Sequence, residues 1–155
     1  MSIDVELTGR LAQLGLRLPE VSPPRGAYVP AVRSGSLVFV AGQVPMADGE
    51  LVATGKVGDG VTTEEGYALS RRCALAALAA AVSVAGERAV VGVVKVVGYV
   101  ASADGFTGQP GVVDGASDLF LAVFGEAGRH ARSAVGVAEL PLGAPVEIEV
   151  VFETA

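Results

Sequence analysis

The sequence predicts an α+β fold: a mixed β-sheet with two main helices on one of its faces. Three features lead to this prediction. Residues 62–85 and 109–124 are long stretches rich in Ala, Leu and Val, each followed by a glycine that can end a helix. Residues 90–101 form an almost continuous apolar run, which is typical of a buried strand. Residues 146–153 alternate between apolar and mainly acidic side chains, as a strand with one buried face does.

The first part of the chain is expected to be a helical attachment to the main domain. Residues 3–16 carry an amphipathic helical pattern that ends near Gly15. Residues 18–27 contain three prolines and are expected to be extended linker. We therefore divide the chain into an N-terminal helical extension, residues 1–20, and a domain of residues 21–155.

Short strands should follow the linker. Residues 28–33 and 37–41 flank Ser-Gly-Ser, which is a turn composition, so a pair of strands is predicted. Residues 51–57 predict a third, weaker strand. The glycines within residues 55–60 match neither a phosphate-binding loop nor a dinucleotide fingerprint, and we assign them to a loop.

Both main helices have recognisable borders. Thr62 and Glu65 have the spacing of a capping box, and Gly86 stands where the first helix should end. Cys73 lies within the buried stripe of this helix and is expected to be a small core residue. The second helix has Pro110 in its first turn, where the missing N–H of proline costs no hydrogen bond.

The end of the chain carries the candidate site. Residues 131–140 and 146–153 predict two strands joined by a tight loop, and a simple antiparallel hairpin would place Arg132 and Glu147 on one face. Small side chains follow Arg132 on that face, and an arginine with space in front of it can bind a carboxylate through two hydrogen bonds. The alternative is a solvated arginine on an edge strand. In this register Glu147 also lies several residues along from Arg132, so their meeting is a hypothesis.

The two helices can cover only one face of the predicted sheet. The strand at residues 90–101 is apolar on both faces, so its second face needs cover as well. The chain has no further layer to supply it. The residues alone therefore predict a homo-oligomer in which sheet faces meet.

Composition excludes several classes of function. The net charge of −6 and the sequence pI near 4.7 argue against a nucleic-acid-binding protein. One cysteine and one histidine allow neither an internal disulfide nor a Cys/His zinc site, and we expect no metal and no other cofactor. No secretory signal is visible, and Lys95 interrupts the apolar run around it. We expect a cytoplasmic protein without membrane contact.

Four segments resemble the RidA/YjgF family. They are YVPAVRSGSLVFVAGQ at residues 28–43, EEGYA at 64–68, RSAVGVAELP at 132–141 and VEIE at 146–149. The resemblance covers roughly residues 20–153, and the two segments at the end of the chain are its most specific part. The longer N-terminus and ASADGF at residues 101–106 indicate a divergent branch of the family.

The resemblance implies a chorismate-mutase-like fold and a homotrimer whose sheets form a central barrel, with ligand clefts between neighbouring chains. It implies hydrolysis of enamine and imine intermediates, such as 2-aminoacrylate, to 2-oxoacids and ammonia without metal or cofactor. By position, Arg132 matches the arginine that binds the substrate carboxylate, and Glu147 matches the acid that positions or activates water. Tyr28 matches a tyrosine of the cleft, and Gly42 matches the backbone position beside the ligand.

Two departures from the family pattern fall in the same cleft. Ala134 stands where RidA has a cysteine, although that cysteine is not an obligatory nucleophile. Asp114 falls near the family's cleft asparagine, with the spacing off by one residue, and its charge would repel an acidic ligand. The family match as a whole predicts that a small carboxylate-bearing metabolite contacts five residues of this cleft: Tyr28, Gly42, Asp114, Arg132 and Ala134.

Three functions remain open at this point. The leading one is hydrolytic deamination of small 2-imino acids, and the alternative is a non-catalytic metabolite-binding or sensing trimer of the same fold. Ribonuclease activity, which is assigned to some members of the family, is disfavoured by the acidic charge and by the absence of a basic and aromatic stripe.

Overall fold

The computed structural model describes residues 6–155. Within them the α-helices are α1 (Leu7–Gln13), α2 (Thr63–Ala85) and α3 (Gln109–Phe124), and short 3-10 helices are η1 (Gly125–Gly128) and η2 (Pro141–Gly143). The long strands are β1 (Ala31–Ser34), β2 (Leu37–Gln43), β7 (Val90–Ala101), β8 (Ala131–Val137) and β9 (Val146–Thr154). Two-residue strands are β3 (Met46–Ala47), β4 (Glu50–Leu51), β5 (Lys56–Val57) and β6 (Gly60–Val61).

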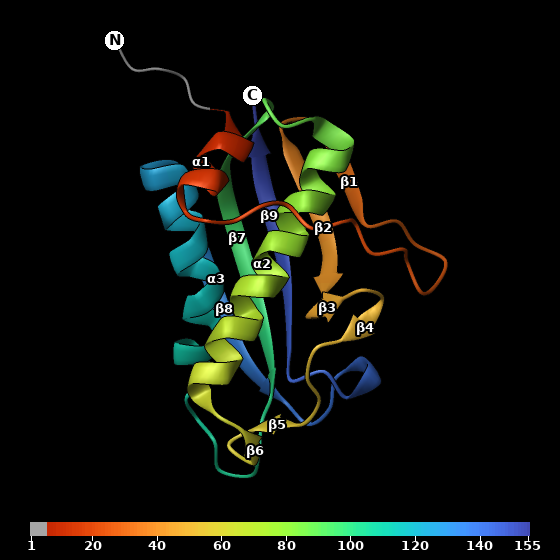
Figure 1. Cartoon of the computed structure of the whole chain (residues 1–155), viewed down its shortest axis with the longest axis vertical. Helices are drawn as coiled ribbons and strands as arrows, with labels where there is room; N and C mark the ends of the chain where they lie inside the picture. The colour runs from red at the N-terminus through yellow and green to blue at the C-terminus, as the bar shows by residue number, and fades with distance from the viewer. Residues whose placement is uncertain (1–5) are drawn as a thin grey trace.

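The long strands form one sheet in the order β1-β2-β9-β7-β8. β7 and β8 pair in parallel, and the other neighbours pair antiparallel. α2 and α3 lie side by side over one face of this sheet (Figure 1). The predicted α+β architecture, a mixed sheet with two main helices on one face, is confirmed. β1 and β8 are the edge strands, so the two ends of the sheet carry unpaired backbone groups.

The helix borders follow the local signals in the sequence. Thr62 accepts a hydrogen bond from the backbone N–H of Glu65, whose side chain accepts one from the Thr62 N–H, so the predicted capping box is confirmed. Gly86 ends α2 with a positive φ of 87°, which a glycine adopts without steric cost. α3 spans the predicted residues, with Pro110 in its first turn.

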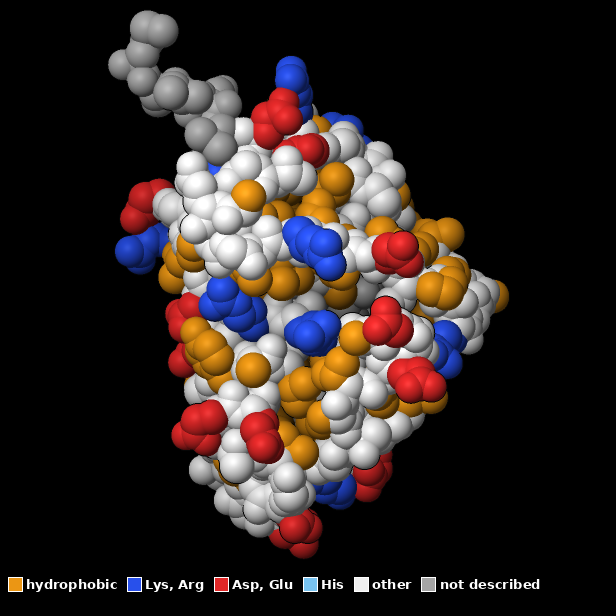
Figure 2. Space-filling view, in the orientation of Figure 1, with side chains coloured by type: hydrophobic (Ala, Val, Ile, Leu, Met, Phe, Trp, Pro, Cys, Tyr) orange, Lys and Arg blue, Asp and Glu red, His pale blue; other side chains and the backbone are white. Residues whose placement is uncertain are grey.

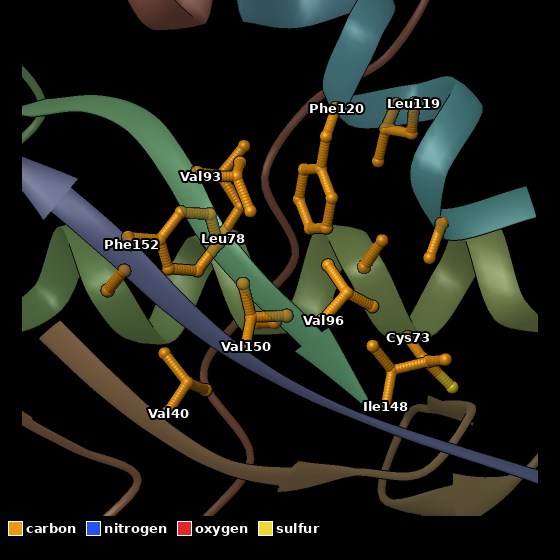
Figure 3. Packing of buried hydrophobic residues seen from close by; sticks show 14 of the residues in the cluster. Val40, Cys73, Leu78, Val93, Val96, Leu119, Phe120, Ile148, Val150 and Phe152 are labelled. Carbon is orange, nitrogen blue, oxygen red and sulfur yellow. The ribbon is translucent and has the colours of Figure 1, made fainter. Parts of the chain in front are cut away.

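The core lies between the sheet and the two long helices. Figure 3 shows Phe120 of α3 and Phe152 of β9 among the buried side chains, and their rings meet edge to face with centroids 5.5 Å apart. Ile148 and Val96 are fully buried beside them. Cys73 is also fully buried in this cluster, as predicted. The apolar side of β9 therefore faces the helices, as the alternation of its residues predicts.

Two of the predicted strands differ from the structure. The weak strand predicted at residues 51–57 is wrong, since this region holds separate two-residue strands, β4 and β5, with different partners. The strand predicted from Tyr28 begins only at Ala31. Tyr28 therefore belongs to the segment that precedes the sheet.

The predicted hairpin at the end of the chain is wrong. β8 and β9 do not pair with each other, because β7 lies between them and pairs with both. Periodicity shows which side chains share a face of a strand, and it does not show which strands are neighbours. β7 is apolar on both faces and takes the inner position, while the connection from β8 to β9 passes across its end.

α1 packs onto the main domain and contributes to its core. Leu7 and Leu11 are buried in the same cluster as the sheet residues. Arg10 donates a hydrogen bond from Nη1 to the backbone oxygen of Val123 at 3.1 Å, and its guanidinium stacks over the ring of Phe124. Residues 3–5 of the predicted first helix lie outside the described residues.

The face of the sheet opposite the helices is open in this chain. Val32 and Phe39 at one side of it and Val94 and Val135 at the other are 40–52% exposed. By length and composition α2 could cross a membrane, but half of its most apolar window is buried inside the fold, as in the core helix of a globular domain. Val32, Phe39, Val94 and Val135 therefore leave apolar surface exposed on the sheet.

Candidate functional site

Arg132 lies on the edge strand β8 and points toward α3. Its pairing partner in β7 is Val96, which faces the helices, so Arg132 takes the same face. Nη1 donates hydrogen bonds to Asp114 Oδ1 at 2.7 Å and to Ser117 Oγ at 3.2 Å. Because only 23% of the Arg132 side chain is exposed, water screens this ion pair less than a pair on the open surface.

His130 extends this group of side chains. Its Nδ1 lies 2.7 Å from the backbone oxygen of Gly128, which can only accept, so Nδ1 carries a hydrogen. In the neutral ring Nε2 is then an acceptor, and the Ser117 hydroxyl lies 2.9 Å from it. Ser117 thus donates to His130 and accepts from Arg132, which fixes the position of the guanidinium. We call Asp114, Ser117, His130 and Arg132 the arginine cluster.

Small residues beside Arg132 bring α3 close to the sheet. A Cβ at Gly98, which pairs with Ala134, would overlap the side chain of Val113 on α3. Ala134 itself is partly buried against the core. The space in front of the guanidinium is occupied by the carboxylate of Asp114. Ala134, which stands where RidA has a cysteine, therefore packs against the core beside α3.

Glu147 lies on the open face of the sheet. It pairs with Tyr99 of β7, whose hydroxyl donates to Glu149 Oε1 at 2.7 Å. Burial raises the pKa of Glu147, and the neighbouring charge of Glu149 raises it further. The carboxyl group lies over the backbone of Gly42, where any Cβ would overlap it. A side chain at position 42 would therefore displace this carboxyl group.

Tyr28 and Gly42 line one pocket of about 340 Å³ beside β2. Tyr28 is 51% exposed, and its hydroxyl accepts a hydrogen bond from the backbone N–H of Arg25 at 3.2 Å. Because Gly42 touches both this pocket and the Glu147 carboxyl group, these residues form a second group. We call Tyr28, Gly42 and Glu147 the glutamate cluster.

One chain does not bring the two clusters together. The hairpin hypothesis placed Arg132 and Glu147 on one face, but they lie on opposite faces of the sheet, on strands separated by β7. Tyr28 lies at the β1 side of the sheet, and Arg132 lies on the opposite edge strand. Among residues 6–155, no group of three or more His, Cys, Asp or Glu side chains is placed to hold a metal ion.

The chain matches one protein family over nearly its whole length. The sequence profile described as "YjgF/chorismate_mutase-like, putative endoribonuclease" matches residues 8–153. The chain belongs to this family. This YjgF-family protein is similar to protein TCP17 of Trypanosoma cruzi, with 43% identity over 97% of this chain and 98% of the relative.

Solved structures agree with the fold. A crystal structure from Shewanella oneidensis MR-1, which carries the same endoribonuclease label, superposes on the YjgF-family chain with a TM-score of 0.91 and 34% identity over 96% of this chain and 99% of that one. A more distant structure, Escherichia coli TdcF with bound serine, gives a TM-score of 0.63 and 25% identity over 87% and 94% of the two chains. The recognition of the family and its chorismate-mutase-like fold are confirmed.

Ser117, Tyr99 and Glu149 were not among the residues selected from the sequence. A signal for Ser117 was present, because Asp114 and Ser117 are three positions apart on a helix and so share its face. Tyr99 and Glu149 are joined only by the pairing of β7 with β9. Sequence spacing alone gives no sign of that contact.

Proposed function

We propose that this YjgF-family protein hydrolyses small 2-imino acids to 2-oxoacids and ammonia, in clefts between the chains of a homotrimer. The observation that carries the proposal is the arginine cluster: a half-buried guanidinium, fixed by Ser117, that already pairs with a carboxylate at 2.7 Å. An arginine in this setting suits the carboxylate of an imino acid. The bound serine of TdcF supports a small ligand that carries a carboxylate.

The position of the two clusters supports an assembly between chains. Arg132 lies on the β8 edge, while the glutamate cluster lies near the β1 edge and on the open face. A trimer in which the apolar open faces meet in a central barrel can place the β8 edge of one chain beside the β1 edge of the next. The arginine cluster of one chain and the glutamate cluster of its neighbour would then complete one site.

The chemistry uses one acid and one cation. Arg132 binds the substrate carboxylate, and the Glu147 carboxylate accepts a proton from water as the oxygen adds to the C=N carbon, then passes this proton to the nitrogen. In the resulting carbinolamine Glu147 moves the hydroxyl proton to the amino group, so that the C–N bond breaks, ammonia leaves and the C=O bond of the 2-oxoacid forms. Burial that raises the pKa of Glu147 favours this use, because a stronger base accepts the proton more readily.

The test couples the purified protein to a dehydratase that generates 2-aminoacrylate. The protein should accelerate pyruvate formation, and Arg132→Ala should lower kcat/KM by about 10- to 100-fold, which corresponds to the loss of a hydrogen-bonded charge pair of about 1.5–3 kcal/mol. Arg129→Ala is the matched control, since within residues 6–155 the side chain of Arg129 pairs with Glu126 alone and both are exposed. No acceleration with any short imino acid would refute the proposal.

A non-catalytic binding or sensing trimer is the second candidate. The observation that favours it is the occupation of Arg132 by Asp114, because an acidic ligand must displace this carboxylate. Thermal stabilisation by a 2-oxoacid without any turnover would support it. The endoribonuclease label of the family is disfavoured by the net charge of −6; cleavage of RNA that is lost in Arg132→Ala would restore it.

A further inference from the structure

A pocket of about 670 Å³ lies between α2 and the segment that joins α1 to β1. We call this segment, residues 14–30, the strap; it crosses α2 in Figure 1. β3 and the turn that follows it, together residues 46–49, complete the walls. The volume lies within the range of small-molecule sites, roughly 300–1,000 Å³. Neither Arg132 nor Glu147 lines this pocket, but it adjoins the smaller pocket of Tyr28 and Gly42, with which it shares Ser22, Pro23, Met46 and Gly49.

α2 presents one helical face to the pocket. The residues that line it are Ala68, Arg71, Arg72, Leu75 and Ala76, at spacings that place them on the same side of the helix. The two alanines leave space between α2 and the strap. Arg71 and Arg72 are the only basic residues of α2, a helix otherwise rich in Ala and Leu. The helix therefore carries its positive charge only where it meets the pocket.

A third cation comes from the strap. Arg17 lines the same pocket, and within residues 6–155 no ion pair and no side-chain hydrogen bond holds Arg17, Arg71 or Arg72. Arg88 and Arg132, in contrast, each pair with a carboxylate. Figure 2 shows Lys and Arg side chains gathered around a hollow on this face, with apolar side chains exposed between them. The pocket thus offers several guanidinium groups that can bind an anion.

The remaining lining sets the size and charge of the ligand. Leu16, Val21 and Met46 add apolar surface. Glu20 and Asp48 also line the pocket, so three guanidinium groups face two carboxylates, with one positive charge in excess. This balance suits a small anion with an apolar body, and it disfavours a polyanion such as nucleic acid.

We propose that this pocket binds a small organic acid. Its oxyanion headgroup, a carboxylate or a phosphate, lies between Arg17 and the Arg71–Arg72 pair, and its apolar body packs against Leu75 and Met46. Such a ligand joins the strap to α2, because it contacts cations on both.

Hydrogen exchange of the strap provides a second measurement of ligand binding. Within residues 6–155, no backbone hydrogen bond joins residues 17–24 to another segment, and Leu16 and Leu18 pack against the core instead. Amide hydrogens of residues 17–24 should therefore exchange readily in the free protein. A ligand that bridges the strap and α2 should slow their exchange.

The experiment measures binding to the full chain by calorimetry and by hydrogen exchange. The probes are phenylacetate and phenyl phosphate, which distinguish a carboxylate headgroup from a phosphate headgroup. Acetate and inorganic phosphate represent the headgroups alone, and benzyl alcohol represents the apolar body alone. We expect one phenylacetate or phenyl phosphate per chain, slower exchange in residues 17–24, and at least tenfold weaker binding of each isolated part.

Matched variants locate the site. Arg71→Gln combined with Arg72→Gln, and separately Arg17→Gln, should weaken binding at least tenfold. Among the described residues these arginines have no side-chain partner, so their replacement should leave the domain folded. Arg129→Gln should bind both probes as the unchanged protein does. In Arg132→Ala the probes should still slow hydrogen exchange in residues 17–24, which distinguishes this pocket from the proposed catalytic site. Unchanged affinity in the double variant, or no binding of either aromatic probe at millimolar concentration, would overturn the proposal.

Discussion

Arg132 and Asp114 form a salt bridge between β8 and α3, with Nη1 and Oδ1 2.7 Å apart. The cation proposed to bind substrate is therefore already paired within its own chain. Ser117 holds the same nitrogen at 3.2 Å, so the guanidinium remains in position when the carboxylate is displaced. The affinity for an acidic ligand then depends on how strongly Asp114 competes with it.

Replacing Asp114 by Asn should strengthen ligand binding. The amide keeps the size of the side chain but removes a negative charge beside Arg132, so we expect the Kd for pyruvate to fall about tenfold, equivalent to about 1.4 kcal/mol. Isothermal titration measures this change. Asp118→Asn is the control, because Asp118 lies one turn along α3 and accepts a hydrogen bond from Tyr67. Weaker binding in Asp114→Asn would show that the carboxylate helps to orient the arginine.

Charge on the open face should break the proposed trimer. Val135 is 42% exposed on the open face of β8, and burial of a carboxylate in an interface there would be costly. Val135→Glu should therefore convert a trimer into monomers in native mass spectrometry. Leu121→Glu is the matched control, since Leu121 is 41% exposed on α3, on the helical side of the sheet. A Val135→Glu protein that stays trimeric would remove the open face from the interface.

Glu147→Gln should raise the stability of the protein at neutral pH. Burial raises the pKa of Glu147 in the folded chain, so the folded state binds more protons than the unfolded state between the two pKa values. Stability is therefore lost as the pH rises through this window, and the glutamine variant avoids that loss. The Tm of the variant should exceed that of the unchanged protein at pH 7, and the difference should vanish below the ordinary glutamate pKa of about 4.3.

Glu153→Gln controls for the removal of a charge from the same face of β9, where Glu153 is exposed. A difference between the Glu147→Gln protein and the unchanged protein that persists at low pH would contradict the assignment to ionisation. The Glu147→Gln variant should also lose imine hydrolysis, because its amide cannot accept the proton from water.

The Cys73 thiol should be inert in the folded protein. Burial raises its pKa, and the charge of Glu147 raises it further, so the reactive thiolate is suppressed. A disulfide reagent such as Ellman's reagent should not react with the native chain, and one thiol per chain should react in denaturant. Rapid modification of the native protein would mean that α2 opens locally from the sheet.

The secondary structure was predictable wherever its cause is local. The capping box of Thr62 with Glu65 and the ending at Gly86 defined α2, since these interactions involve residues a few positions apart. The apolar alternation of β9 identified its buried side for the same reason. The weak strand at residues 51–57 failed because strands of two residues leave no periodic pattern.

The arginine cluster was only partly predictable. The family resemblance selected Arg132 and Asp114, and the structure joins them directly. Ser117 and His130 complete the cluster through contacts between α3 and the approach to β8. Those contacts depend on how close α3 comes to the sheet, which the small residue Gly98 permits. Packing distance of this kind is absent from a pattern of residue types.

The sequence by itself determined the fold class, the borders of the two long helices and the buried side of β9, because near neighbours and side-chain periodicity control all three. Only the tertiary structure decided that β7 separates β8 from β9, and so that Arg132 and Glu147 face opposite sides of the sheet. Strand order results from competition among distant segments for pairing and burial. The alternation of residue types along a strand does not show which strands become its neighbours.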